Sequence, residues 1–150
     1  MTVTVRLSNA GHPRFSETAQ LLDEYRQHYG ANPAPEATEA WMRDQVIGER
    51  LRVYAAGPGH TVHGVCTVAV VPASLTLRTA WLIRDLYVTP DARGRGVARA
   101  LISSVADAAR TEGAHRISLQ TETGNQRALQ LYAKGGFEIV ADVTLLHRVL

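Results

Sequence analysis

The sequence predicts one domain of mixed α/β class over residues 1–150, with one parallel crossover inside its sheet. The 150 residues, 45 % hydrophobic and 20 % charged, have an ordinary globular composition, and a chain of this length can bury a full core. Strand and helix patterns follow one another as strand, two helices, three strands, helix, strand, helix and closing strands. A helix joins the last of the three consecutive strands to the strand that follows. A parallel βαβ unit is therefore expected within the sheet.

The first third of the chain predicts a strand, two helices and a second strand. Thr2–Leu7 alternates and is rich in β-branched residues, which is typical of a strand. Ser16 is a capping residue for a helix that Gly30 ends, and Ala37–Leu51 can form a second helix before a strand at Arg52–Ala56. The apolar residues that indicate this second helix are Trp41, Val46 and Ile47.

The middle of the chain predicts a β-hairpin followed by an amphipathic helix. Two β-rich segments, Thr61–Val71 and Thr79–Val88, are joined by the loop PASLTL, which favours antiparallel pairing. A helix starts at Gly94 and ends at Gly113. Its apolar stripe consists of Val97, Leu101, Ile102, Val105 and Ala109.

The last third predicts shorter elements. Ile117–Thr121 has the pattern of a strand, and Asn125–Lys134 has the pattern of a short helix. The remaining residues are expected to form one or two closing strands.

Charge and composition exclude several classes of protein. The formal net charge is +2, and the positive charge is almost entirely arginine, because Lys134 is the only lysine. The arginines are scattered among acidic residues except at Arg93, Arg95 and Arg99, so no basic stripe is present and nucleic-acid binding is not expected.

The single cysteine and the N-terminal sequence indicate a cytoplasmic protein without membrane contact. Cys66 excludes an internal disulfide and lies in the strand-like run VCTVAVV, where a buried thiol is expected. The start MTVTVRLSN lacks the pattern of a signal peptide, and no apolar run reaches the ~18 residues of a membrane span. The six histidines show no paired metal spacing, so no metal is expected.

The stretch PDARGRGVARAL, residues 90–101, predicts an anion site at the start of a helix. A helix N-terminus leaves backbone N–H groups unpaired and carries a partial positive charge. Gly94 and Gly96 lack the Cβ atoms that would keep a phosphate away, and Arg93 and Arg95 add full charges. A diphosphate fits this arrangement, but an isolated RGRG also fits the start of a plain surface helix, and neither a P-loop nor a dinucleotide fingerprint is present.

Three linked motifs between Leu82 and Val140 add a family context. Arg93, Gly96 and Ala98 fit the pattern R-x-x-G-x-(G/A), Asn125, Ala128, Leu131 and Tyr132 fit N-x-x-A-x-x-L-Y, and Gly136 and Phe137 supply a G-F pair. With these motifs the sequence resembles the GNAT superfamily of acyl-CoA-dependent N-acyltransferases.

The resemblance implies a GNAT-like fold, which is a central, mostly antiparallel sheet with splayed parallel strands in the middle, flanked by about four helices. It also implies acetyl-CoA as co-substrate, with its diphosphate on the loop and its pantetheine beside a splayed strand. The residues so implied are Leu86, Tyr87 and Val88 for the pantetheine and Arg93, Gly94, Arg95, Gly96, Val97 and Ala98 for the diphosphate.

Acetyl transfer to an amine needs a proton acceptor for the amine and a proton donor for the leaving thiolate. In the family position Tyr132 is the general acid and Asn125 contacts the cofactor or orders a water, although core packing and helix capping are alternative roles for these two residues. Some members carry a glutamate where Gln120 stands, so the base is left to Glu122, expected on the same side of its strand, or to Asp85. A plain salt-bridged strand residue is the alternative for both carboxylates.

The acceptor site is expected from the early helices and from Arg84. Polyamine acetyltransferases, which the strand IRDLYV otherwise resembles, have an acidic residue where Arg84 stands. Arg84 would repel a polycation and could bind a carboxylate or phosphate. Tyr25, Tyr29 and Glu36, with Trp41, could line a small substrate site, although aromatic residues at helical spacing are more often core.

Three functions are compatible with these residues. The first is an enzyme that acetylates the primary amine of a small molecule, such as an amino acid derivative, an amine metabolite or an antibiotic. The second is a protein or peptide N-acetyltransferase, and the third is a non-catalytic acyl-CoA sensor, which the missing family glutamate slightly favours. The oligomeric state is left open, and a homodimer is compatible with the sequence.

Overall fold

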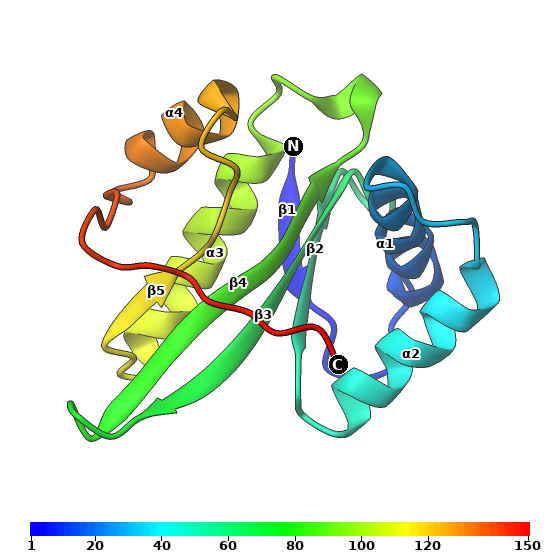
Figure 1. The fold of residues 1–150 in the computed structure, drawn as a ribbon. Coiled ribbons are helices and arrows are strands. Elements are labelled where there is room, and N and C mark those ends of the chain that lie inside the picture. Colours follow the sequence, from blue (N-terminus) through cyan, green and yellow to red (C-terminus); the bar gives the residue numbers. More distant parts are fainter. The chain divides into compact units, whose positions relative to one another are not determined.

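The computed structural model describes all residues from 1 to 150 and shows two compact units, Met1–Gln120 and Thr121–Leu150 (Figure 1). The first unit contains a five-stranded sheet with strand order β1-β2-β3-β4-β5. The strands are β1 (Val3–Arg6), β2 (Arg52–Gly57), β3 (Gly64–Ala73), β4 (Arg78–Val88) and β5 (Arg116–Ser118).

Pairing in the sheet is antiparallel from β1 to β4 and parallel between β4 and β5. This confirms the predicted mixed α/β class, the hairpin between the two long strands and the parallel crossover. The parallel pair, however, lies at the edge of the sheet and not in its middle, because β5 is the last strand of the order.

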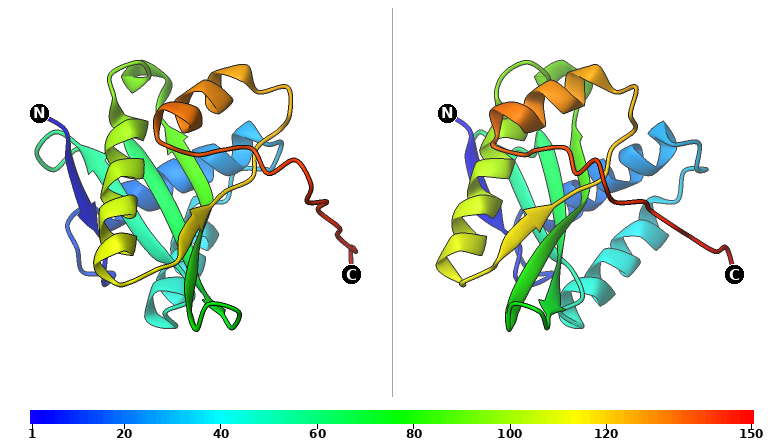
Figure 2. Two further views of the ribbon diagram at one scale, coloured as in Figure 1. Left: turned by 90° about the vertical axis from the view of Figure 1, so that its left-hand side faces the viewer. Right: turned by 60° about the vertical axis from the view of Figure 1, so that its left-hand side comes forward.

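Helices cover both faces of this sheet (Figures 1 and 2). Helices α1 (Phe15–His28) and α2 (Pro35–Ile47) lie on one face, and α3 (Val97–Thr111) lies on the other, after the short 3-10 turn η1 (Pro90–Ala92). The five residues of the predicted apolar stripe of α3 are all buried. At Gly64 on β3 an added Cβ would lie 2.7 Å from Val97 Cγ1, so glycine allows α3 to approach the sheet closely.

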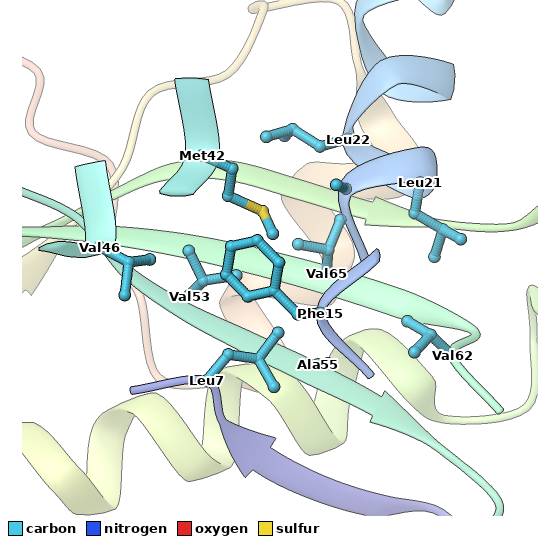
Figure 3. Close-up of a cluster of buried hydrophobic side chains, with 11 residues drawn as sticks. Leu7, Phe15, Leu21, Leu22, Met42, Val46, Val53, Ala55, Val62 and Val65 are labelled. Atoms are coloured by element: carbon cyan, nitrogen blue, oxygen red, sulfur yellow. The ribbon is translucent and has the colours of Figure 1, made fainter. Parts of the chain in front are cut away.

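The face under α1 and α2 holds the main hydrophobic cluster (Figure 3). The Phe15 ring, 1 % exposed, lies between Met42 of α2 and strand residues such as Val53. Burial of large apolar side chains of this kind contributes about 1.5–3 kcal/mol each to folding. Packing against the sheet therefore accounts for the position of α1, whose far end carries part of the site described below.

The start of α1 and the inner face of α2 differ from the prediction. Helix α1 begins at Phe15 with Arg14 at the N-cap, and the Ser16 hydroxyl donates a 2.6 Å hydrogen bond to Glu39 Oε1 instead of capping. The predicted cap, Ser16, is therefore wrong by two residues. In α2 the buried residues are Thr38, Met42 and Val46, which repeat every four residues, whereas Trp41 and Ile47 are exposed.

The second unit contains helix α4 (Gln126–Lys134), close to its predicted bounds. Residues 137–150 contain no strand, so the expected closing strands are absent. Apolar β-branched residues favour a strand only when a neighbouring strand supplies ladder hydrogen bonds, and these residues have no such partner. The exposed apolar residues of this segment are Ile139, Val140, Val143, Leu145, Leu146, Val149 and Leu150.

None of the helices combines the length and the apolar character that crossing a membrane requires.

Candidate active site

The two parallel strands separate partway along β4. Pairing with β5 covers Ala80, Trp81 and Leu82 and stops there, although β4 continues to Val88. The second half of β4 therefore has a paired edge toward β3 and an unpaired edge on the side of β5.

Backbone groups near the end of β4 point to this open edge. Thr89 N–H donates to the carbonyl of His63 at 2.9 Å, on the side of β3. Successive residues of a strand direct their backbone groups to opposite sides, so Leu86 and Val88 direct theirs away from β3. The Val88 carbonyl accepts a hydrogen bond from Arg93 Nε, and the other groups are available to a ligand that carries peptide-like amides.

The loop after β4 forms an open cradle at the start of α3. Gly94 and Gly96 have positive φ angles of 77° and 81°, a conformation that side chains with a Cβ rarely adopt. A Cβ added at either position would meet no atom within 4 Å, so the space above the loop is open. The first helical bond runs from Ala100 N–H to Gly96 C=O, which leaves the N–H groups from Gly94 to Arg99 without a backbone acceptor. These donors fit a diphosphate, as the sequence predicts.

The Arg93 side chain stabilises the same loop by contacts with the end of β4. Its Nε donates to the carbonyl of Val88 at 3.0 Å, and its guanidinium carbon lies 5.7 Å from the centre of the Tyr87 ring. Arg93 thus fixes the turn between β4 and the loop, in addition to the charge that the sequence assigns to it.

A β-bulge stands in the middle of β4. Thr67 faces Asp85 and Val68 faces Ile83, so Arg84 is an extra residue without a partner on β3. The buried Thr67 hydroxyl donates a short hydrogen bond to Asp85 Oδ2. Arg84 is exposed and makes no hydrogen bond or ion pair within the chain. The structure therefore holds Asp85 by a side-chain bond that the sequence did not indicate, and leaves Arg84 free for an anion.

Cys66, the neighbour of Thr67, is fully buried, as predicted. Burial, together with the negative charge of Asp85, raises the pKa of its thiol to about 12. The reactive thiolate form is therefore scarce at neutral pH.

Three tyrosines and a glutamate meet where the end of α1 lies beside β4. The Tyr25 ring centre is 5.1 Å from that of Tyr29 and 6.1 Å from that of Tyr87. The Tyr87 hydroxyl donates to Glu24 Oε2 at 3.3 Å. We call Glu24, Tyr25, Tyr29 and Tyr87 the tyrosine cluster. Tyr25 and Tyr87 pack against the main core, whereas Tyr29 is 63 % exposed.

Two other residues that the sequence suggested for the acceptor site make no hydrogen bond, ion pair or ring contact with this cluster. Glu36 is exposed in the first turn of α2 and makes no hydrogen bond or ion pair. Trp41, further along α2, is 48 % exposed. Of the suggested acceptor residues, the structure brings only Tyr25 and Tyr29 together.

The second unit carries the remaining predicted residues. Asn125 is the N-cap of α4, and its Oδ1 accepts a 3.2 Å hydrogen bond from Ala128 N–H, which is the capping role named as its alternative. The ring of Tyr132 packs edge-on against Phe137, with centres 5.9 Å apart. Glu122 is exposed and lies outside β5, because that strand ends at Ser118 and not at Thr121. The expected shared strand face of Gln120 and Glu122 is therefore wrong.

Sequence reasoning missed Thr67 and Glu24. A polar residue inside the apolar run VCTVAVV was a signal for a buried hydrogen bond at Thr67. Glu24 gave no signal, because its partner Tyr87 is 63 positions away in the chain and only the fold brings the two together.

The family model described as Acetyltransferase (GNAT) family matches residues 17–137. The chain belongs to this family, and it is an acetyl-CoA-dependent N-acetyltransferase, which confirms the resemblance drawn from the three motifs. The open β4 edge and the glycine cradle fit the amides and the diphosphate of that co-substrate.

Two curated proteins show the range of similar sequences. The uncharacterized N-acetyltransferase YhfO of Bacillus subtilis is 28 % identical over 132 residues, which are 88 % of this chain and 87 % of YhfO. The L-amino acid N-acyltransferase MnaT of Escherichia coli is 38 % identical over 59 residues, which are 39 % of this chain and 34 % of MnaT.

Solved structures share the fold at low sequence identity. A probable acetyltransferase superposes with a TM-score of 0.87 at 24 % identity and covers 100 % of this chain and 97 % of its own. An aminoglycoside acetyltransferase from a soil metagenome, in complex with sisomicin, gives 0.82 at 16 % identity, with coverages of 99 % and 96 %. A predicted acetyltransferase with acetyl-CoA from Clostridium acetobutylicum gives 0.74 at 15 % identity, with coverages of 98 % and 96 %. At these identities the likeness concerns the fold alone.

Proposed function

We propose that this enzyme, acting as one catalytic domain, moves the acetyl group of acetyl-CoA directly to a primary amine of a small molecule. The observation that carries the proposal is the open edge of β4 beside the glycine cradle. Pantetheine amides would pair with the backbone of Leu86 and the N–H of Val88, and the diphosphate would accept hydrogen bonds from the N–H groups of residues 94–98. Asn125 is a further proposed cofactor contact. Acetyl-CoA supplies the thioester that is attacked.

The state of Cys66 supports direct transfer. A covalent acetyl-enzyme would need an accessible nucleophile, and the single thiol is buried with its pKa raised to about 12. The amine of the acceptor is then the nucleophile, and it must lose a proton first because an alkyl ammonium has a pKa of about 10.4.

Of the two candidate proton acceptors, Asp85 and Glu122, Asp85 has the stronger structural support. Its carboxylate is partly buried on the β4 face toward α1 and is oriented by Thr67. Glu122 is the other candidate and would act from the second unit. Tyr132, by its position in the family motif, would return a proton to the leaving thiolate, and its ring contact with Phe137 would orient the phenol.

The acceptor is proposed to be a small amine because of the relatives and the exposed side chains near β4. MnaT is named for L-amino acids, and the fold neighbour from a soil metagenome binds sisomicin. In this chain Arg84 offers an unpaired guanidinium for a carboxylate of the acceptor, and Tyr25 and Tyr29 offer ring surface. Glu36, exposed in the first turn of α2, is a further candidate for the same site.

The test is release of free CoA thiol when the purified protein is incubated with acetyl-CoA and a panel of small amines and peptides. Release with small amines supports the proposal, and release only with peptides supports a peptide acetyltransferase instead. Tight calorimetric binding of acetyl-CoA without thiol release would indicate a sensor. A calorimetric titration with no heat would contradict the proposed cofactor site.

A further inference from the structure

The tyrosine cluster has the composition of a site for a positive charge. The face of an aromatic ring is negative, and it attracts an ammonium or guanidinium group within about 6 Å of the ring centre. Arg93 already places its guanidinium carbon 5.7 Å from the centre of the Tyr87 ring. One cation of the protein itself therefore lies against the cluster, while the exposed ring of Tyr29 has no arginine or lysine over it.

The Glu24 carboxylate places a full negative charge beside the rings. Burial, together with the nearby charge of Glu24, raises the pKa of the Tyr87 phenol. The phenol therefore keeps its proton over the neutral range and donates it to Glu24, which holds that carboxylate beside the rings. An ammonium at this point would meet both a negative carboxylate and negative ring faces.

Packing alone does not account for the cluster. The neighbouring residues Leu21 and Leu22 of α1 are 4 % and 3 % exposed, as expected for residues that serve the core. Glu24 is exposed and Tyr29 is 63 % exposed, so these two side chains gain little from burial. Both side chains are therefore accessible to a ligand.

The cluster lies on the face of β4 that also carries Asp85. Tyr87 is two residues beyond Asp85, so the two side chains point to the same face, about 6.6 Å apart along the strand. The backbone of the adjacent Leu86 faces the open edge proposed for pantetheine. A cation bound by the cluster would thus lie near both the proton acceptor and the thioester.

We propose that the tyrosine cluster holds the positively charged amine of the acceptor, so that Glu24 and Tyr29 determine specificity for ammonium-bearing acceptors. This inference rests on the proposed function, because it names the group by which the small-molecule acceptor is recognised. The ammonium is captured between Glu24 and the rings. One of its N–H protons then passes to the carboxylate of Asp85, and the freed nitrogen lone pair becomes the nucleophile.

The binding test uses choline and the neutral alcohol in which a carbon replaces the ammonium nitrogen. These two probes have the same shape, and the choline nitrogen cannot be acetylated, so the readout does not depend on turnover. Shifts of the tyrosine ring protons in NMR titrations would give both affinities. We expect choline to bind about five-fold more tightly than the neutral alcohol, as for a moderately exposed cation–π contact.

Variants of exposed residues separate recognition from folding. Glu24→Gln and Tyr29→Leu should bring the two affinities close to equal, whereas Tyr29→Phe should keep the preference because the ring remains. In turnover assays Glu24→Gln should raise the KM of the amine about five-fold and leave kcat and the KM of acetyl-CoA unchanged. Asp107→Asn, an exposed carboxylate on α3, is the matched control and should change none of these values.

Equal affinities of the wild-type protein for the two probes would overturn the inference, even if thiol release continued to support acetyl transfer. A choline preference that survives both Glu24→Gln and Tyr29→Leu would overturn it as well. Absence of thiol release with every amine would contradict the proposed function instead, and the choline preference would still test the cluster.

Discussion

The hydroxyl of Thr67 on β3 donates a hydrogen bond to the carboxylate of Asp85 on β4, next to the bulge at Arg84 where the register of the two strands shifts. A bulge redirects the side chains that follow it, and the buried hydroxyl fixes one of them. Asp85 therefore has a defined orientation beside the edge where β4 loses its parallel partner.

We expect Asp85→Asn to lower kcat about 100-fold, because an amide cannot accept the proton of the acceptor amine. Thr67→Val should lower kcat less, since it removes only the bond that orients the carboxylate. Steady-state thiol release with saturating acetyl-CoA measures both effects. Glu122→Gln is the parallel variant, and a larger loss of kcat there than in Asp85→Asn would assign the base to Glu122.

The glycine at the start of α3 offers a test with an internal control. Gly96 has φ 81° and Gly113, near the end of the same helix, has φ 74°, and an added Cβ meets no atom within 4 Å at either position. Alanine at either site should therefore cost about 1–2 kcal/mol of folding free energy from backbone strain alone.

Only Gly96→Ala should also weaken acetyl-CoA binding. We expect about a tenfold loss of affinity, the equivalent of one charge-assisted hydrogen bond of about 1.4 kcal/mol. Isothermal titration gives the affinity and urea unfolding gives the stability. If Gly113→Ala lost affinity to the same extent, strain and not the cradle would be the cause.

The extent to which sequence predicts this fold differs between elements. The buried face of helix α3 was predicted residue by residue, because such a face leaves a clear period of 3.6 in the apolar residues, but the predicted start at Gly94 is wrong and the helix begins at Val97. For helix α2 only Val46 of the three predicted apolar residues is buried, since Trp41 and Ile47 are exposed and hydrophobicity alone does not say which side of a helix is buried. The closing strands failed for a related reason, because a strand needs a partner as well as a composition.

The candidate site divides in the same way. The cradle of Gly94 and Gly96 depends on local backbone conformation, which a short sequence motif can predict. The bond between Tyr87 and Glu24 depends on residues far apart in the chain, and a single sequence carries no record of such contacts.

Tyr132→Phe should lower kcat about 100-fold and leave the affinity for acetyl-CoA unchanged, because only the acidic proton is lost. The ring that packs on Phe137 remains, so folding should be retained. Tyr54→Phe on β2 is the control, since it removes a phenol from the buried sheet, outside the proposed site. Thiol release gives kcat and calorimetry gives the affinity. An unchanged kcat in Tyr132→Phe would show that another group donates the proton to the leaving thiolate.

Arg84→Ala should raise the KM of carboxylate-bearing amines about tenfold, the effect of losing one hydrogen bond between charged groups. The KM of simple diamines should stay the same or fall, because a nearby positive charge is removed. The measurement is thiol release with amine pairs of equal length that differ only in a terminal carboxylate or amine. Equal changes for both members of each pair would exclude a role of Arg84 in anion recognition.

Asp23, one residue before the tyrosine cluster, is the anchor of the connection between α1 and α2. Its buried carboxylate accepts hydrogen bonds from Thr38 Oγ1 at 2.9 Å, Arg26 Nη1 at 2.6 Å and the backbone N–H of Ala34 at 3.2 Å. Burial alone would raise the pKa of this carboxyl, but the hydrogen bonds outweigh it and hold the pKa below the ordinary value of 3.8.

A depressed folded pKa means that ionised Asp23 stabilises the fold above the unfolded pKa of about 3.9, and that this stabilisation is lost as the pH falls through the folded pKa. We therefore expect Asp23→Asn to reduce the unfolding free energy by about 2 kcal/mol at pH 7. The difference from wild type should shrink below pH 4. Urea unfolding across this range measures it, with Asp107→Asn as the exposed control. A difference that stays constant between pH 7 and pH 3 would show that the charge of Asp23 does not stabilise this connection.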